Sequence, residues 1–234
     1  MTTDTFSRPT ALIVHAHPEA ASFSTAQAGS ARRSLEAQGY AVTMIDLYAR
    51  SWNPVLDQSE FAPFEGAFKP QHEQWNAVKN GTLSAEVQAD LNAVLAADLL
   101  VLSFPMWWFS VPSILKGWID RVFVMGATFG GDLGLFENAG LAGRQAIVLT
   151  STGGSPASFE PGGAFGDVSD FLYHVHRGML EFVGYTVLEP VITYGPAHLS
   201  DPERAEALDV VAEAFAHIDN RLPLSEGRAM AVQH

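Results

Sequence analysis

Short apolar runs recur along the chain, and segments with helical spacing lie between them. Five runs are found, at residues 11–16, 41–47, 98–103, 145–151 and 185–194. Runs of this length without polar interruption are typical of strands that are covered on both faces. Strands that alternate with helices predict a parallel sheet with helices on both sides. The expected fold is therefore α/β: a doubly wound, five-stranded parallel sheet.

Capping residues and prolines mark where helices are expected to begin. The expected helices cover about 22–38, 84–97, 112–122, 167–182 and 201–220, and the residues expected to open them are Ser22 or Ser24, Ser84, Pro112, Asp167 and Asp201 with Pro202. Residues 48–83 are rich in Pro, Gly, Asn and aromatic residues without a clear period, so we expect a long functional loop there. No repeat or linker divides the chain, which predicts one domain over 1–234 with loose tails at 1–9 and 222–234.

The composition excludes several classes of protein. The formal net charge of −13 argues against nucleic acid as a partner, because phosphate backbones require clustered Lys and Arg. The chain has no cysteine, which excludes disulfides, thiol nucleophiles and thiolate metal sites. No apolar run is long enough to insert into a membrane, and no signal segment is recognised at the N-terminus. We therefore expect a cytoplasmic protein.

The loop after the third apolar run is the most distinctive part of the sequence. Pro105 stops the strand, since proline cannot donate to a sheet ladder, and Met106, Trp107, Trp108 and Phe109 then crowd the turn. In open α/β sheets, ligands bind outside the carboxyl ends of the strands. A flat apolar loop in that place suits a planar ring system, although core packing beneath a loop is an equally good explanation of the aromatic residues alone.

Two further loops are expected at the same edge of the sheet. After the first run, the backbone amides of Phe23 and Ser24 can point at a phosphate from a helix start, with His17 nearby. The dinucleotide fingerprint and the P-loop are both absent from this loop. After the fourth run, Gly153 and Gly154 let the backbone approach a ligand closely. A phosphate at the first loop and a flat ring between the other two is the layout of a flavin site.

The motifs resemble those of a known family. The most specific are Ala-Leu-Ile-Val-x-Ala-His17, Phe-Pro-x-x-Trp-Phe109, Val-Pro-x-Ile-Leu-Lys-Gly-Trp118, Thr-Gly-Gly154 and Val-Leu-Glu-Pro190. In these segments the chain resembles the NAD(P)H:quinone oxidoreductases of the DT-diaphorase type, in the flavodoxin-like superfamily. The resemblance implies the strand order 2-1-3-4-5, a flavin cofactor, NAD(P)H as hydride donor, a quinone-like acceptor, and a homodimer with the site at the subunit interface.

The resemblance also assigns residues to the cofactor. Those implied for the phosphates are His17, Ser22, Phe23 and Ser24. Those implied for the flavin ring are Pro105, Met106, Trp107, Trp108 and Phe109. Those implied for the polar edge of the ring are Ser151, Thr152, Gly153 and Gly154. Asp120 and Arg204 match positions that contact the adenine half of FAD, which favours FAD, with FMN as the alternative.

The resemblance implies a ping-pong reaction in which hydride passes through the flavin N5 atom. Trp108, Phe109 and Phe129 would clamp the acceptor, and Gly153 and Gly154 would stabilise the reduced ring by hydrogen bonds from their amides. Apolar walls sort planar acceptors poorly, so azo dyes and nitroaromatic compounds are expected as further acceptors. The alternatives are a flavin-binding regulatory subunit of a potassium efflux system and a flavodoxin-like electron carrier.

The sequence departs from the family pattern in two places. Phe159 and Phe165 stand where the family typically has a Tyr and a His near the flavin, so no side-chain acid in this loop is expected to be essential. Trp107 replaces a smaller polar residue and is expected to narrow the quinone pocket. Asp170, His174 and His176 hint at a metal site, but His176 points away from the other two on a helix, so we expect no metal.

Overall fold

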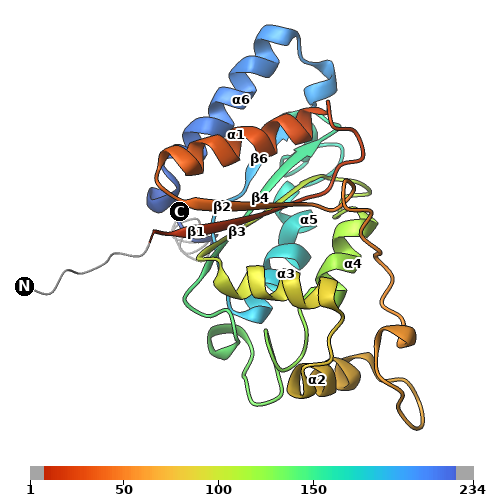
Figure 1. Cartoon of the computed structure of the whole chain (residues 1–234). Helices are drawn as coiled ribbons and strands as arrows, with labels where there is room; N and C mark the ends of the chain where they lie inside the picture. The colour runs from red at the N-terminus through yellow and green to blue at the C-terminus, as the bar shows by residue number, and fades with distance from the viewer. Residues whose placement is uncertain (1–7, 225–234) are drawn as a thin grey trace, which may run out of the picture.

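In the computed structural model, which describes residues 8–224, six strands form one parallel sheet (Figure 1). The strands are β1 (Thr10–His15), β2 (Ala41–Asp46), β3 (Leu99–Pro105), β4 (Gln145–Thr152), β5 (Thr186–Val187) and β6 (Val191–Tyr194). The order across the sheet is β2-β1-β3-β4-β5, and β6 also pairs with β4. The predicted α/β class, the parallel sheet and the strand order 2-1-3-4-5 are confirmed, with Pro105 as the last residue of β3.

The fifth predicted strand is split into two short ones, which corrects the expected strand count. β5 pairs with Gln145 and Ala146 at the start of β4, whereas β6 pairs with residues 149–152 at its end. Pro190 lies between the two short strands and cannot donate a backbone hydrogen bond, so the ladder along β4 is interrupted there.

Helices cover both faces of the sheet, as expected (Figure 1). One face carries α1 (Phe23–Ala37) and α6 (Asp201–Ala216), and the other carries α3 (Ala85–Ala96), α4 (Ser113–Val122) and α5 (Val168–Val175). Side chains alternate along each strand, so Ala11 and Ile13 belong to the core under α1 and α6, whereas Leu12 and Val14 belong to the opposite core. Each face of the sheet therefore has its own apolar core.

Three of the predicted helix caps are confirmed. Ser22, Ser84 and Asp167 each accept a hydrogen bond from a backbone amide in the first turn of the helix that follows. The cap of α6 is Ser200 rather than Asp201, because Ser200 and Glu203 form a reciprocal capping box. Beyond α5 the chain continues through a π-helical turn (His176–Leu180) and a 3₁₀ turn (Glu181–Val183) to the predicted end of the helical segment.

The expectation of one long loop over 48–83 is wrong for part of that range. It contains a 3₁₀ turn (Gln58–Glu60) and the helix α2 (Pro70–Asn80). Pro70 occupies the first turn of α2, Lys79 lies in its last turn, and Gly81 follows with a left-handed backbone of φ 65°. These are ordinary boundary signals, but the helix carries too few apolar residues to show a period.

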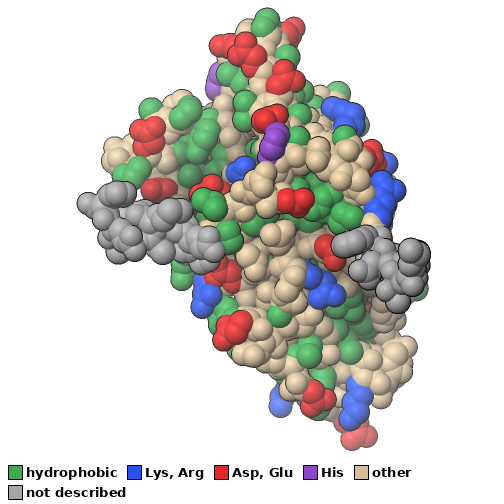
Figure 2. Space-filling view, turned by 90° about the vertical axis from the view of Figure 1, so that its left-hand side faces the viewer, with side chains coloured by type: hydrophobic (Ala, Val, Ile, Leu, Met, Phe, Trp, Pro, Cys, Tyr) green, Lys and Arg blue, Asp and Glu red, His purple; other side chains and the backbone are tan. Residues whose placement is uncertain are grey.

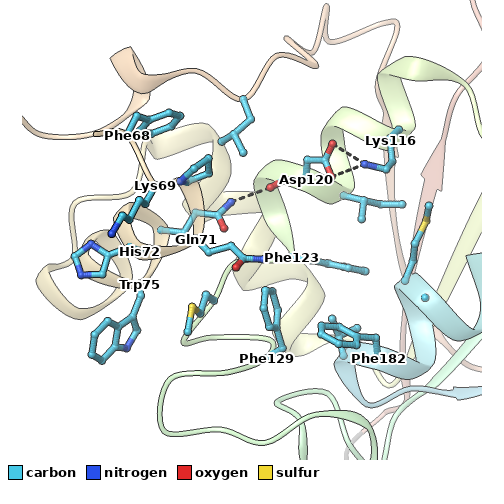
Figure 3. Close-up of a pocket in the computed structure, with 18 of the residues that line it drawn as sticks. Phe68, Lys69, Gln71, His72, Trp75, Lys116, Asp120, Phe123, Phe129 and Phe182 are labelled. Carbon is cyan, nitrogen blue, oxygen red and sulfur yellow. Dashed lines mark hydrogen bonds and ion pairs between the residues drawn. The ribbon is translucent and has the colours of Figure 1, made fainter. Parts of the chain in front are cut away.

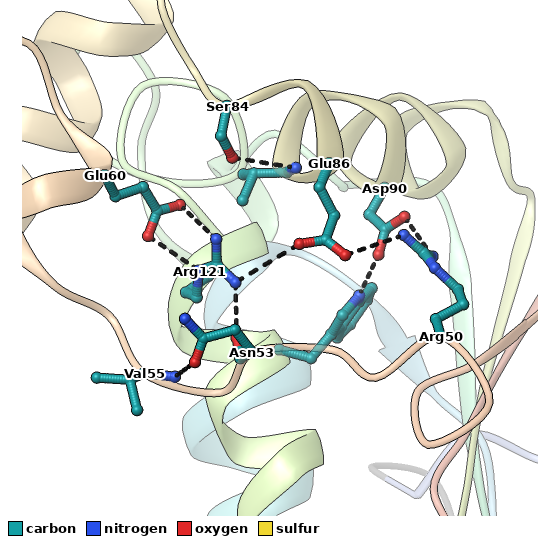
Figure 4. A network of polar contacts seen from close by, with 10 residues as sticks. Arg50, Asn53, Val55, Glu60, Ser84, Glu86, Asp90 and Arg121 are labelled. Atoms are coloured by element: carbon teal, nitrogen blue, oxygen red, sulfur yellow. Dashed lines mark hydrogen bonds and ion pairs between the residues drawn. The ribbon is translucent and has the colours of Figure 1, made fainter.

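A buried polar network fixes the start of this range to the helices below the sheet (Figure 4). Arg121 on α4 is 7% exposed and donates to both carboxylate oxygens of Glu60, at 2.9 and 3.1 Å. Its Nη1 also donates to the carbonyl oxygen of Asn53 at 2.6 Å. On α3, Asp90 accepts from Arg50 and from the Trp118 indole, both at 2.8 Å. Residues 50–60 are therefore held although they contain little regular structure.

The inner residues of the two expected tails, 8–9 and 222–224, are attached to the rest of the structure. The amide of Ala41 donates to the carbonyl of Pro9 at 2.8 Å, and that of Glu189 donates to the carbonyl of Leu222 at 3.1 Å. Pro223 bridges to Leu188, so both ends are attached to the sheet at these positions. The rest of the predicted tails, residues 1–7 and 225–234, lies outside the described residues.

One side of the molecule carries charged and apolar side chains without a large patch of either kind. Figure 2 shows the side that lies on the left in Figure 1, where Lys and Arg side chains are dispersed among acidic and apolar ones. Within residues 8–224, no helix has the length and apolar character needed to cross a membrane.

Candidate functional site

Three loops meet at the carboxyl ends of β1, β3 and β4, on the right in Figure 1. They enclose a cavity of about 630 Å³, here called the main groove, and a smaller one of about 250 Å³, here called the aromatic pocket. Met106, Thr152 and Gly153 line both cavities, so the two adjoin. The sequence prediction that these loops share one edge is confirmed.

The first turn of α1 forms one end of the main groove. Ser22 caps the helix by accepting from the Thr25 amide at 3.1 Å, and His17, Ser22, Phe23 and Ser24 all line the groove. Among the described residues, the amides of Phe23 and Ser24 have no hydrogen-bond acceptor. Unsatisfied amides at the positive end of a helix dipole suit a phosphate group.

The loop after β4 forms the floor of the groove. Ser151 Oγ lies 3.0 Å from Ser24 Oγ, which ties this loop to α1. A Cβ atom on Gly153 would meet nothing within 4 Å, so the backbone there is open to a ligand. At Gly154 a Cβ would lie 2.9 Å from the ring of Phe165 and 3.1 Å from that of Phe159. Glycine at position 154 therefore lets the two rings close over the backbone.

Arg204 lines the same groove from α6. Its Nε donates to the carbonyl of Pro196 at 3.1 Å, and its Nη1 donates to the carboxylate of Asp201 at 2.9 Å. Pro196, Ala197 and Leu208 line the groove beside it. The groove thus extends beyond the helix start to a region that is apolar except for one guanidinium group.

The loop after β3 is a tight aromatic turn. Trp107 and Ser110 exchange two backbone hydrogen bonds of 3.0 Å, and between them Trp108 and Phe109 adopt left-handed backbones with φ of 52° and 56°. Two consecutive left-handed residues define the kind of turn usually built with Asn and Gly. The side chain of Trp108 is 96% exposed in the single chain.

The aromatic pocket contains no ionisable side chain among the residues that line it. Phe109, Phe159 and Phe165 form its walls, and Phe109 stacks on Phe171 of α5 with ring centroids 4.5 Å apart. Tyr194 packs behind Phe159, and burial raises the pKa of its hydroxyl, which keeps it protonated at neutral pH. The pocket can bind a flat apolar molecule, but its walls offer no acid or base.

Trp107 lies on a different side of the aromatic turn from Trp108 and Phe109. It lines the main groove, with its ring centroid 6.1 Å from that of His17, and it does not line the aromatic pocket. The turn directs successive side chains to different sides, so Trp107 faces the helix start whereas Trp108 and Phe109 face the aromatic pocket. Within one chain Trp107 borders the main groove and not the aromatic pocket, so its expected narrowing of the quinone pocket stays a prediction.

Asp120 and Phe129 are not brought together with the other predicted site residues. They line a separate cavity of about 1020 Å³, here called the second cavity (Figure 3). Asp120 pairs with Lys116 at 2.6 Å, and Phe129 packs on Phe182 with ring centroids 5.3 Å apart. The cavity is bordered by α2, α4, the segment 123–129 and the segment 174–183.

Sequence reasoning missed the second cavity as a whole. Its aromatic side chains come from three stretches with no shared motif, residues 68–75, 123–129 and 174–183, and are Phe68, Trp75, Phe123, Phe129 and Phe182. His174, considered above as a metal ligand, also lines this cavity, and its Nε2 lies 3.0 Å from Ser110 Oγ of the aromatic turn. Only the tertiary arrangement shows this cavity, since no local pattern joins those segments.

Comparisons with known proteins agree with this architecture. A family model described as having the flavodoxin-like fold matches residues 9–217. The chain is 35% identical over 224 residues to NAD(P)H dehydrogenase [quinone] 1 of Cavia porcellus, covering 92% of this chain and 78% of that protein. It is 36% identical to human ribosyldihydronicotinamide dehydrogenase [quinone] over 197 residues, covering 82% and 84% of the two chains.

A solved structure is similar over almost the whole chain. It is that of a protein from Klebsiella pneumoniae assigned as a quinone reductase, with a TM-score of 0.84 and 31% identity, covering 93% of this chain and 87% of that one. The fold, the site at the carboxyl edge of the sheet and these similarities agree. The chain is an oxidoreductase that belongs to the NAD(P)H:quinone oxidoreductase family of flavodoxin-like proteins.

Proposed function

We propose that the chain transfers two electrons from NAD(P)H to quinone-like acceptors, using a flavin held by the main groove and the aromatic pocket. The observation that carries the proposal is the meeting of three loops at one edge of the sheet. One loop offers unsatisfied helix amides, one is aromatic, and one has an open glycine backbone. Family membership supports the same reaction.

The residues present fit a flavin. The amides of Phe23 and Ser24 would bind its phosphate, and the hydroxyl of Ser22 and the imidazole of His17 border the same end of the groove. Pro105, Met106 and Trp107 would lie along the ring and its side chain, with Trp108 and Phe109 at the ring's far end. Ser151, Thr152, Gly153 and Gly154 would meet its polar edge.

The shape of the groove favours FAD over FMN. Beyond the helix start, the groove is also lined by Pro196, Ala197, Arg204 and Leu208, which would be available to the adenine half of FAD. A guanidinium group beside apolar carbon suits an adenine ring. If FMN is the cofactor, Arg204 and the apolar residues beside it do not contact the flavin.

When bound, the flavin supplies the chemistry, because it can accept hydride at N5 and return two electrons. The chain's part is to position and shield. The apolar walls of the aromatic pocket would shield one side of the ring, and the amides at Gly153 and Gly154 can hydrogen-bond its polar edge. NAD(P)H, a quinone and one proton give NAD(P)⁺ and a hydroquinone. The lining of the aromatic pocket in one chain holds no acid, so that proton would come from outside this lining.

We infer that the working enzyme is a homodimer in which the second cavity of one protomer faces the aromatic pocket of the other. Trp108, Phe109 and Phe165 are 96%, 39% and 45% exposed in the single chain, around an apolar pocket that is open on one side. Exposed apolar side chains gathered at one place are typical of a contact surface. This arrangement would bring Asp120 and Phe129 of one protomer to the other's flavin and acceptor.

Steady-state kinetics tests the proposal. With FAD added, NADH or NADPH oxidation should depend on a quinone such as menadione, and initial-rate plots at several donor concentrations should be parallel. Intersecting plots would contradict a shared slot for donor and acceptor, and oxidation independent of the quinone would contradict the activity. Azo dyes and nitroaromatic compounds should also be reduced, because apolar walls distinguish planar acceptors weakly.

The absence of an acid from the pocket walls can be tested separately. Phe165→Ala removes a half-exposed wall and should change the KM for the acceptor, while kcat stays within about threefold because no proton donor is lost. Phe165→Tyr serves as the matched control that keeps the wall. A loss of kcat of a hundredfold or more in Phe165→Ala alone, at about the size of a missing general acid, would contradict the mechanism.

A further inference from the structure

A buried histidine lies beneath the main groove and has no part in the reaction described above. His15 is the last residue of β1 and is completely buried. Its Nδ1 lies 3.1 Å from Ser103 Oγ on β3, and its Nε2 lies 3.1 Å from Thr25 Oγ1 in the first turn of α1. Both ring nitrogens therefore have a hydroxyl partner on elements that also border the groove.

Thr25 connects this imidazole to the turn that lines the groove. Its Oγ1 lies 2.9 Å from Ser22 Oγ and donates to the backbone carbonyl of Glu19 at 3.1 Å. Ser22 Oγ in turn accepts from the amide of Thr25. The three contacts of one hydroxyl thus join the strand, the helix cap and the loop before the helix.

Counting protons gives the direction of these hydrogen bonds. A carbonyl oxygen can only accept, so the hydroxyl hydrogen of Thr25 is used on Glu19. The contact between His15 and Thr25 then requires a hydrogen on Nε2, and neutral His15 accepts from the Ser103 hydroxyl at Nδ1. The chain of donors runs from Ser103 through His15 and Thr25 to Glu19.

The surroundings of His15 favour its neutral form. Burial lowers the pKa of the imidazole and His17 in the loop adds to this shift, whereas Asp46 on β2 and the backbone of Ser103 on β3 oppose it. The partners on β3 and α1 are the uncharged hydroxyls of Ser103 and Thr25. An uncharged imidazole with one hydrogen can act as a fixed link between two hydroxyls.

We propose that His15, as the neutral Nε2–H tautomer, is a positioning residue that holds the Thr25–Ser22 turn in the geometry that receives a cofactor phosphate. This inference rests on the proposed flavin function. The turn carries the two unsatisfied amides of Phe23 and Ser24, and the loop that it fixes leads from His17 to Ser22, both of which line the groove. Removing the link keeps both amides in the chain but frees the turn that carries them to move away from the phosphate-binding geometry.

Ligands with and without a phosphate test this role. The apoprotein is titrated with FAD, FMN and riboflavin, and flavin fluorescence gives each Kd. In His15→Leu and Thr25→Val, the Kd for FAD and FMN should rise about tenfold, the size of one lost hydrogen bond, while that for riboflavin stays unchanged. Thr25→Ser keeps the hydroxyl and should bind all three ligands like the wild type.

Each other outcome overturns the inference. An equal loss of affinity for all three ligands, or a lower melting temperature with unchanged affinities, would mean that His15 supports the fold in general and does not position the phosphate-binding turn. Thr25→Ser behaving like Thr25→Val would mean that the hydroxyl has no role. If His15→Leu does not fold, the two Thr25 variants decide. A wild-type protein that binds none of the three ligands would refute the proposed function itself, and this inference with it.

Discussion

Trp108 and Phe109 hold the backbone in a conformation that their side chains disfavour. Left-handed backbone in residues with a Cβ atom costs free energy, of order 1–3 kcal/mol at each such residue. Within the single chain the side chain of Trp108 is almost fully exposed, so its burial does not offset this free-energy cost. Strain of this kind persists where function needs the side chain in that place, which agrees with a role at the acceptor pocket.

Replacing Trp108 with Asn should separate stability from activity. Asn accepts left-handed backbone readily, so Trp108→Asn should raise the free energy of unfolding of the single chain by about 1 kcal/mol, as measured by urea denaturation. The same variant should lower kcat/KM for quinones tenfold or more. Because Trp108 belongs to the proposed subunit contact, the comparison is made at protein concentrations where both proteins are monomeric, and a stability loss there would show that the turn is not strained.

Tyr185 is buried with no hydrogen-bond partner for its hydroxyl among the described residues. Burial raises the pKa of this hydroxyl above its ordinary value near 10. A group with a raised folded-state pKa contributes its stability below the unfolded pKa and loses it as the pH rises through the folded pKa. Alkaline pH should therefore destabilise the protein in part through Tyr185.

Tyr185→Phe should have little effect, or stabilise slightly, at pH 7, because no hydrogen bond is lost. Between pH 10 and 12 the variant should lose stability less steeply than the wild type, as measured by urea unfolding at a series of pH values. Tyr40→Phe is the control at pH 7 only, because burial and Asp219 raise the pKa of Tyr40 as well, but Tyr40 donates to Asp219 at 2.8 Å and loss of that hydrogen bond should cost about 1 kcal/mol. Parallel stability curves for Tyr185→Phe and the wild type would contradict a contribution of Tyr185 to the loss of stability at alkaline pH.

At the scale of elements, the segment 50–60 depends on buried ion pairs rather than on regular structure. Arg121→Met leaves Glu60, which is 9% exposed, without its partner, so it should cost about 3–5 kcal/mol of stability. Limited proteolysis should then cut within 54–69 faster than in the wild type. The double variant Arg121→Met, Glu60→Leu should recover much of the loss, and a double variant no more stable than Arg121→Met would contradict the role of the pair.

Local signals account for most of the elements that the sequence predicted. Apolar runs located the first four strands, and Ser22, Ser84 and Asp167 cap the helices that they were expected to open. The sequence missed α2, whose apolar residues are too few to give a period, and the break at Pro190, which depends on pairing with β4. Those features are decided by tertiary contacts.

The site was predictable only in part for the same reason. Loops that follow parallel strands must meet at one edge, so the residues from His17 to Gly154 that line the main groove and the aromatic pocket could be grouped from sequence. The resemblance named Asp120 and Phe129, but their place in a separate cavity depends on how α4 and the segment 123–129 pack. The side on which Trp107 lies depends on the left-handed turn beside it, which aromatic residues do not signal.

At the scale of the whole molecule, a site shared between protomers predicts that two inactive variants can complement each other. Gly153→Val should fill the groove without a clash in the fold. Phe129→Asp should place a charge in the apolar wall of the second cavity and so prevent it from binding an acceptor. A hybrid dimer has one site with both halves intact, so it should recover about half of the wild-type activity.

Hybrids can be isolated by two affinity tags after co-expression. Val210→Asp in place of Phe129→Asp is the control, since Val210 is 66% exposed on α6 and lines none of the three cavities described here. Its homodimer should be fully active. Hybrids of Gly153→Val and Phe129→Asp that are no more active than the two parent homodimers would show that each site is complete within one chain.

The central claim is that the loops at the carboxyl edge of the sheet hold a flavin that NAD(P)H reduces. The most direct measurement is the absorption spectrum of the purified protein, followed by chromatographic identification of any flavin that heat releases. We predict FAD close to one per chain, bleached by NAD(P)H without oxygen and restored by a quinone. A protein that carries no flavin and takes up neither FAD nor FMN would contradict the claim and leave the aromatic turn as ordinary packing.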